Sequence, residues 1–342
     1  MNFIKKLIYS TIMAGILLVA MNGTFIETEA SEKQRDDYTF GEIEGILLSY
    51  LNDNGYNLEI GTPQFNEFVI TQMNTDKDQE LANLDEYHLI CAYFAEYLHQ
   101  LTLYETELIE QQDFSNSDQL NTLDVIEEEN DEDLSEPFNM NAIDDFTLGE
   151  MKQEIEQEEQ EIKVARQMND NAISIMATNT INVTNARAYA KKHFSSYNPL
   201  YPKYSNDCTN FVSQILQAGG RRQISLLTTN TLTRDNKYWF IKRKPDNTYS
   251  RSASWTVVTD LYSHLVRTQG SYSSTSKSNI RTNAKNGDVI QFKKSGADRY
   301  SHAMWIYEKT SSDLKLAGHT NDYWNRSFNA ITGYTTYRII KM

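Results

Sequence analysis

Charge and apolar periodicity both change along this chain close to residue 183. From there to the end the sequence has 24 Lys and Arg against 9 Asp and Glu, whereas the first 182 residues have 8 against 38. Apolar residues recur at helical spacing in the first part, and the second part adds short strand-like runs after its helices. The sequence therefore predicts an acidic, mainly helical N-terminal region and, after it, a basic α+β domain at 183–342.

The first thirty residues have the pattern of a secretory signal peptide. Lys5 and Lys6 precede a stretch without charge at 7–21, and Thr28-Glu29-Ala30 resembles a cleavage site. The stretch is shorter than the ~20 residues that a membrane-spanning helix needs. We therefore expect residues 1–30 to be a signal peptide and the rest of the chain to be secreted or cell-wall associated, with an uncleaved anchor as the alternative.

The N-terminal region then covers residues 31–182. Apolar spacing predicts helices between Tyr38 and about Ile109, with breaks at Asn54-Gly55 and at Gly61-Thr62-Pro63. After about residue 110 the segments are distinguished by their composition, because acidic and polar stretches have too few apolar residues to bury a core. These segments are a solvated stretch at 110–145, a charged surface helix from Phe146 through Ala165, and a linker at 169–183.

The second domain changes from helices to strands along the chain. We expect helices where apolar residues recur every three to four positions, and strands where they alternate beside turn residues. Helices followed by an antiparallel sheet define an α+β domain. The expected helices are 185–194, 208–218 and 255–266, and the expected strands are 288–292, 302–307, 314–319 and 334–340.

The second of the two cysteines, Cys208, begins an expected helix. Positions 208, 211, 212, 215 and 216 form an apolar stripe, and the residues Ser205-Asn206-Asp207 supply N-caps. The positive end of the helix dipole favours a thiolate there, so Cys208 is a candidate nucleophile. An equal alternative is that Cys208 is only the first core residue of the apolar stripe. Cys91 fits the core face of a helix, and a Cys91–Cys208 disulfide is a further alternative.

A thiolate nucleophile needs a base within hydrogen-bond reach, and the chain has six histidines. The strands on either side of Thr310–Asp313 predict a hairpin in which residues whose numbers sum to 621 are paired. His302 and His319 have that sum, so we expect one to orient the other. The remaining histidines, expected at the surface or in packing, are His88, His99, His193 and His264.

A family resemblance rests on motifs of this second domain, which are Asp207-Cys208-Thr209-Asn210-Phe211-Val212-Ser213-Gln214, Ala218-Gly219-Gly220, Gly287-Asp288-Val289-Ile290, Ser301-His302-Ala303-Met304 and Gly318-His319-Thr320-Asn321-Asp322. Residues 183–342 thereby resemble the putative amidase domain of the papain-like superfamily, which also contains the CHAP and NlpC-type cell-wall hydrolases. The resemblance implies Cys208 as nucleophile, His302 as general base and acid, and His319 as the orienting residue, with Asn321 as the alternative. The helix start would place the Cys208 N–H in an oxyanion hole, completed by Tyr197, Asn198 or Tyr204.

The expected function is therefore that of an exported bacterial cysteine amidohydrolase that cleaves an amide bond in peptidoglycan or a cell-wall peptide. A non-catalytic cell-surface binding module on the same fold is the alternative. We expect no cofactor, no nucleic-acid partner and no metal, since His302, His319 and Asp322 lack a tight ligand motif. The opposite charges of the two halves favour an intramolecular contact between them.

Overall fold

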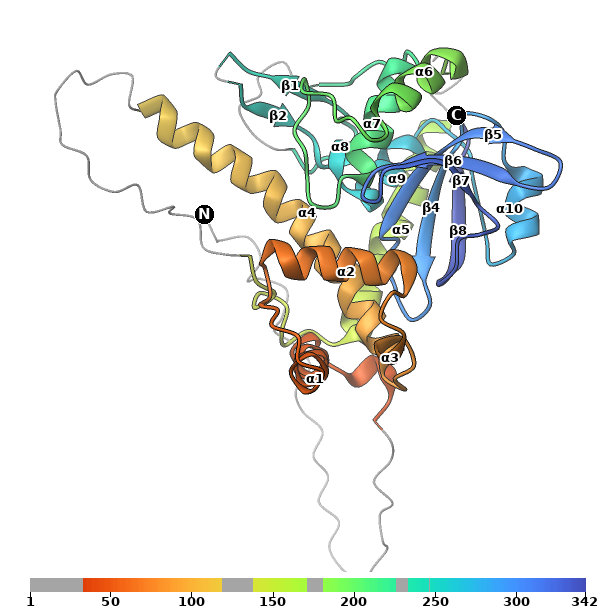
Figure 1. Cartoon of the computed structure of the whole chain (residues 1–342). Helices are drawn as coiled ribbons and strands as arrows, with labels where there is room; N and C mark the ends of the chain where they lie inside the picture. The colour runs from red at the N-terminus through yellow and green to blue at the C-terminus, as the bar shows by residue number, and fades with distance from the viewer. Residues whose placement is uncertain (1–32, 119–137, 171–180, 226–232, 246) are drawn as a thin grey trace, which may run out of the picture. The chain divides into compact units, whose positions relative to one another are not determined.

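The computed structural model of the chain describes residues 33–118, 138–170, 181–225, 233–245 and 247–342 (Figure 1). The expected signal peptide lies outside the described residues, as does most of the expected linker. None of the described helices is both long and apolar enough to cross a membrane. Residues Gln34–Met342 form one compact unit, so contacts between its helical part and its α+β part can be followed residue by residue.

The N-terminal helices begin and end near the predicted breaks. Thr39 caps α1 in a capping box with Glu42, and Thr62 caps α2 just ahead of Pro63. The breaks at 54–55 and 61–63 are therefore confirmed. Within residues 33–118 the helices are η1 (Arg35–Asp37), α1 (Phe40–Asp53), α2 (Pro63–Thr75), α3 (Gln79–Ala82) and α4 (Tyr87–Asp118).

The structure differs from the expected solvated stretch at 110–145 at both ends of that stretch. Its first residues belong to α4, and residues 119–137 lie outside the described part. Phe138 and Met140 are buried in the N-terminal core, where the Phe138 ring lies 5.1 Å from the ring of Tyr97. Composition missed them because their apolar partners on α4 are distant in the sequence. The charged helix is α5 (Leu148–Asp170), with Met151 buried.

The C-terminal domain confirms the α+β class. A two-stranded hairpin, β1 (Ile241–Arg243) and β2 (Tyr249–Arg251), accompanies a six-stranded antiparallel sheet of order β3–β8–β4–β5–β6–β7 in the described residues. The strands of the larger sheet are β3 (Ser271–Ser274), β4 (Val289–Lys294), β5 (His302–Lys309), β6 (Leu314–Gly318), β7 (Tyr323–Ser327) and β8 (Tyr334–Ile340).

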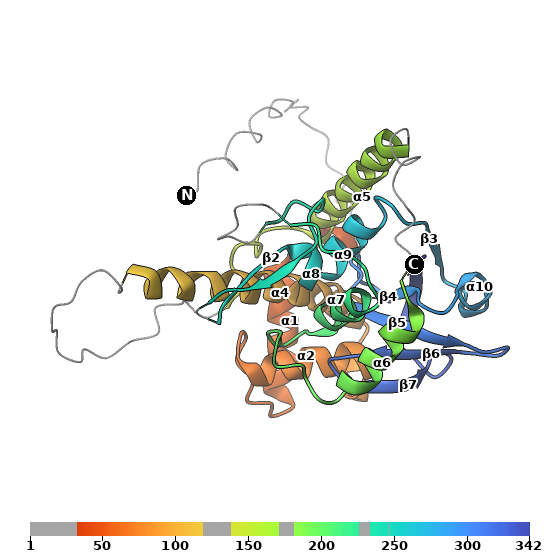
Figure 2. The same cartoon turned by 90° about the horizontal axis from the view of Figure 1, so that it is seen from above.

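Helices of this domain cover one face of the larger sheet. α6 (Val183–His193) contacts α7 (Cys208–Ala218), and α7 contacts β5 and β6 (Figure 2). Alternation along β5 directs Ala303 and Trp305 toward α7, whereas Met304 and Ile306 enter a second core on the other face. The helix predicted at 255–266 is divided by extended Val257 into α8 (Ala253–Thr256) and α9 (Val258–Leu265). The short α10 (Lys277–Asn283) and the strands β1, β2, β3 and β7 were not predicted.

Buried contacts join the N-terminal helices to the α+β domain. Nε of Arg299 lies 2.7 Å from Oε2 of Glu96, and both side chains are almost fully buried. Ala297, in the loop between β4 and β5, is part of the N-terminal core. Gly296 in that loop approaches α4 so closely that an added Cβ would lie 2.2 Å from the carbonyl oxygen of His88. The loop that leads into β5 is therefore held by α4.

Candidate active site

Cys208 is the first residue of α7 and is completely buried. Its Sγ lies 3.7 Å from Oγ1 of Thr209, and the backbone N–H of Ala303 in β5 hydrogen-bonds to it. Burial raises the pKa of the Cys208 thiol to about 11, although these two hydrogen bonds oppose the rise. The expected thiolate is therefore wrong for this state, because desolvation outweighs the helix dipole. Both cysteines are free, so Cys91 and Cys208 do not form the alternative disulfide.

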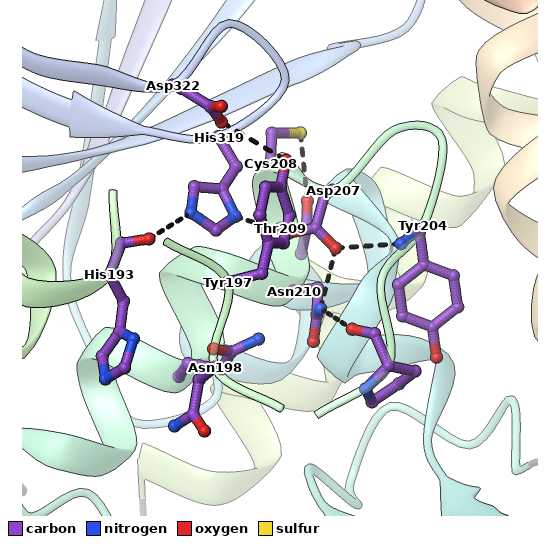
Figure 3. A network of polar contacts seen from close by, with 12 residues as sticks. His193, Tyr197, Asn198, Tyr204, Asp207, Cys208, Thr209, Asn210, His319 and Asp322 are labelled. Carbon is purple, nitrogen blue, oxygen red and sulfur yellow. Dashed lines mark hydrogen bonds and ion pairs between the residues drawn. The ribbon is translucent and has the colours of Figure 1, made fainter. Parts of the chain in front are cut away.

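Asp207 precedes Cys208, and its carboxylate connects three parts of the site. It makes no capping bond to α7, contrary to the expectation. Instead, Oδ1 accepts the backbone N–H of Tyr204 at 3.1 Å and Nδ2 of Asn210 at 2.8 Å. Oδ2 lies 2.6 Å from Nδ1 of His319 (Figure 3). Burial raises the pKa of Asp207, and the bond to His319 opposes that rise.

His319 is held on both of its ring nitrogens. Nδ1 faces the Asp207 carboxylate, and Nε2 lies 2.9 Å from the backbone carbonyl oxygen of His193. The ring stacks on Phe211 of α7, with centroids 3.6 Å apart and planes 2° apart. Both ring nitrogens of His319 therefore face an oxygen atom that can accept a hydrogen bond. This arrangement leaves His319 without a free nitrogen for His302.

The hairpin register explains why His319 and His302 do not meet. Trp305 pairs with Ala317, one residue away from the expected register, and a bulge interrupts the pairing after Ile306. If this register continued for two more residues, His319 would lie opposite Ala303 and not opposite His302. A shift of one residue turns a side chain to the other face of the sheet. The expected cross-strand pair of His302 and His319 is therefore wrong.

His302 is the first residue of β5 and is only 6% exposed. Its ring lies 5.7 Å from that of Phe292 and 6.4 Å from that of Tyr334, and the planes of the latter pair differ by 17°. Burial lowers the pKa of His302 to about 4, so the imidazole is neutral at physiological pH. Within the described residues no hydrogen bond joins it to Cys208 or Asn321, and Nδ2 of Asn321 is buried without a partner. The thiol and the imidazole thus lie on neighbouring elements without forming an ion pair.

A cavity of about 520 Å³ lies between α2 and the loops that precede α7 and succeed β6. Two of the residues considered for the oxyanion hole, Tyr197 and Tyr204, line it. The Tyr197 hydroxyl donates to Oδ1 of Asp322 at 3.3 Å, whereas the Tyr204 hydroxyl is buried without a partner in the described part of the chain. The third, Asn198, donates from Nδ2 to the hydroxyl of Tyr189. Of the three, Tyr204 is the one whose side-chain polar group makes no hydrogen bond within the described residues.

Sequence reasoning missed two features that the structure brings to this site. Asp207 was interpreted as a helix cap, and its partner His319 lies 112 residues away, which no local signal could reveal. Tyr334 lies against His302, yet the sequence marked it only as the first residue of an expected strand. Among the described residues no cluster of three or more His, Cys, Asp and Glu could hold a metal ion.

Comparison with known proteins bears on the chemistry of this domain. Residues 180–341 match the model of a family described as "Putative amidase domain", which suggests amide hydrolysis. A similar curated protein is the uncharacterized protein YhbB of Bacillus subtilis (strain 168), with 30% identity over 159 residues. The match covers 43% of this chain and 44% of that protein, so the chain spans less than half the length of this relative. No solved structure matches the chain.

Proposed function

We propose that the C-terminal domain is a cysteine-dependent amidase of papain-like fold, with Cys208 as nucleophile and His302 as base. The observation that carries this proposal is the contact between the Cys208 thiol and the backbone N–H of Ala303, the residue after His302. The helix that begins with Cys208 thus packs against the strand that begins with His302. The segment that contains both lies within the amidase-family match.

The proposed reaction is acyl transfer and then hydrolysis. His302 takes the thiol proton while Sγ of Cys208 attacks the amide carbonyl carbon. The backbone N–H of Cys208, at the start of α7, stabilises the oxyanion. As the C–N bond breaks, His302 gives its proton to the leaving amine. Water activated by His302 then cleaves the thioester, which releases the carboxylic acid and restores the thiol.

His319 serves in this proposal as a positioning residue instead of the orienter of His302. Through Asp207 it fixes the loop that leads into Cys208, and its ring packs on Phe211 of the same helix. Asn321 remains the alternative orienting residue, because its Nδ2 is unpaired in the described part of the structure and lies on the loop after His319. In this proposal neither His319 nor Asn321 reacts with the substrate: His319 positions Cys208, and Asn321 would orient the His302 ring.

The proposed substrate is an amide in peptidoglycan or a cell-wall peptide, and the proposed location is outside the cytoplasm. The signal-peptide pattern at 1–30 supports the location, and the motif resemblance supports the substrate class. A binding module without turnover is the second candidate, favoured by the neutral thiol and the neutral imidazole of this state. The two candidates differ in whether amide bonds are broken.

The test is the appearance of new amino groups when the full chain is incubated with purified peptidoglycan. Cys208→Ala removes the nucleophile, and Cys91→Ala is the matched control, because Cys91 is also buried and free but lies on α4. We expect release by the Cys91→Ala protein and none by the Cys208→Ala protein. Binding to peptidoglycan without release by any of these proteins would favour the binding module.

A further inference from the structure

Lys294 is a buried cation of the C-terminal domain whose polar partners come from the N-terminal region. It is the last residue of β4 and is 2% exposed. Its Nζ lies 2.5 Å from Oδ1 of Asp76, and it donates to the carbonyl oxygens of Gln72 at 3.3 Å and Met73 at 3.1 Å. These groups form the C-terminal end of α2, where the helix dipole places partial negative charge. The end of α2 thus neutralises the Lys294 ammonium.

Tyr334 joins this contact to the proposed base. It pairs with Lys294 across strands β4 and β8, and its ring is the one that stacks beside His302. Its hydroxyl donates to Oδ1 of Asn74 at 2.5 Å. The Tyr334 ring therefore lies beside His302, and Nζ of Lys294 lies 5.8 Å from the centroid of the same ring. The end of α2 supplies an amide oxygen to the Tyr334 hydroxyl and a carboxylate to Lys294.

In this structure the reacting groups are closed off. Cys208 is 0% exposed and His302 6%, so an amide carbonyl from solution has no access to the thiol. Two cavities border α2, one of about 520 Å³ and one of about 530 Å³, and each has walls from both parts of the chain. Neither cavity is lined by Cys208 or His302. The structure is therefore that of a closed state.

We propose that Lys294 and Tyr334 form a subsite for a carboxylate-bearing segment of the amide substrate, and that Asp76 and Asn74 of the α2 end fill this subsite and keep the site closed. The proposal rests on the amidase function proposed above. An unpaired buried ammonium is strongly unfavourable, so when Asp76 leaves, Lys294 must be exposed to water or bind another anion at the same place. The ligand class that fits is an acidic peptide, with a carboxylate for Lys294 and an amide oxygen for Tyr334.

Opening needs only the end of α2 to move, because α4 has contacts of its own with the α+β domain. The buried pair of Arg299 and Glu96 involves α4, as does the close approach of the loop between β4 and β5. Oε2 of Glu105 on α4 also accepts the backbone N–H of Ser205 at 3.1 Å. The N-terminal region can therefore stay attached while the subsite is vacated.

Asp76→Asn in the full chain tests the closure. Asp76 has φ 48°, a left-handed conformation that Asn tolerates, so the change removes the charge without adding backbone strain. We expect Cys208 to react with iodoacetamide at least about tenfold faster than in the unmodified protein, since loss of one partner of a buried charge pair changes such equilibria by more than that. Peptide mass mapping gives the rate at Cys208.

Asp53→Asn is the matched control, because it makes the same charge change at an exposed position at the end of α1. Asn74→Ala, which removes the partner of the Tyr334 hydroxyl, is a second opening variant. The closure is overturned if Cys208 in both opening variants, each with an intact thermal unfolding transition, reacts at the rate of the Asp53→Asn control. Alkylation needs no turnover, so this result is independent of whether the chain is an amidase.

The ligand class is tested with N-acetylaspartate as the probe and N-acetylasparagine as its counterpart with an uncharged side chain. In the Asp76→Asn protein we expect millimolar N-acetylaspartate to slow the alkylation of Cys208 and N-acetylasparagine to leave it unchanged. Adding Lys294→Met should abolish that protection. Equal effects of the two compounds, or protection that persists without Lys294, would show that the subsite does not select a side-chain carboxylate.

Discussion

The carboxylate of Asp207 lies 2.6 Å from Nδ1 of His319, and both side chains are almost completely buried. This pair connects the residue before Cys208 to the loop after β6. Because the second ring nitrogen of His319 donates to the His193 carbonyl, the pair stabilises three segments at once. The protein therefore uses His319 to build the site around Cys208.

His319→Ala should lower the free energy of unfolding by about 3–5 kcal/mol, because it leaves the Asp207 carboxylate buried without its partner. Urea unfolding gives the value. In a double-mutant cycle, adding Asp207→Asn should cost much less in the His319→Ala background than in the unmodified protein. Strict additivity of the two changes would mean that the pair contributes no coupling.

Glu96→Gln should also destabilise the protein by about 3–5 kcal/mol, since Arg299 would lose its buried partner. The same guanidinium binds Glu158, whose side chain is 54% exposed. Glu158→Gln should therefore cost no more than about 1 kcal/mol. The urea midpoints of the two variants compare these costs. Equal losses of stability would contradict the view that Arg299 binds Glu96 of α4 more strongly than Glu158.

The pKa of His302 makes the fold sensitive to acid. Burial lowers this pKa to about 4, whereas an unfolded histidine titrates near 6.5. Between these values the unfolded state binds more protons, so stability is lost as pH falls from about 6.5 to 4, by about 3 kcal/mol for this group. His302→Gln should lose less stability over that window, and exposed His88→Gln should behave like the unmodified protein. Identical pH profiles for all three proteins would contradict the burial effect.

In the closed state both thiols should resist alkylation at pH 8. Burial raises the pKa of Cys208 to about 11 and that of Cys91 to about 12, so little thiolate is present at either position. We expect iodoacetamide to label neither cysteine in the native chain on the timescale on which it labels both in urea. Rapid labelling of Cys208 in the native, unmodified chain would mean that the site is open in solution.

Local sequence signals predicted those elements whose bounds depend on neighbouring residues in the sequence. The apolar stripe and Gly219-Gly220 predicted the bounds of α7, and its first residue is Cys208 as expected. The hairpin register was not predictable, since a bulge after Ile306 shifts the pairing and no residue marks it. β3, with the sequence Ser-Tyr-Ser-Ser, has no apolar alternation and forms because β8 lies beside it.

The site differs from its prediction for the same physical reason. The pairing of Asp207 with His319 and the contact of Asn74 with Tyr334 both join segments that are far apart in the sequence, by 112 and 260 residues. The helix dipole was expected to lower the pKa of Cys208, but desolvation of the buried thiol outweighs it. Burial by distant parts of the chain decided the outcome.

The most direct measurement is the rate at which the Asp76→Asn chain releases amino groups from purified peptidoglycan, with and without Cys208→Ala. In the closure proposed above, Asp76→Asn opens the site without altering a reacting group, so we expect it to give the nucleophile its best access. We predict release by the Asp76→Asn protein that falls to the rate of peptidoglycan alone when Cys208→Ala is added. Release that continues unchanged without the Cys208 thiol would contradict its role as the nucleophile.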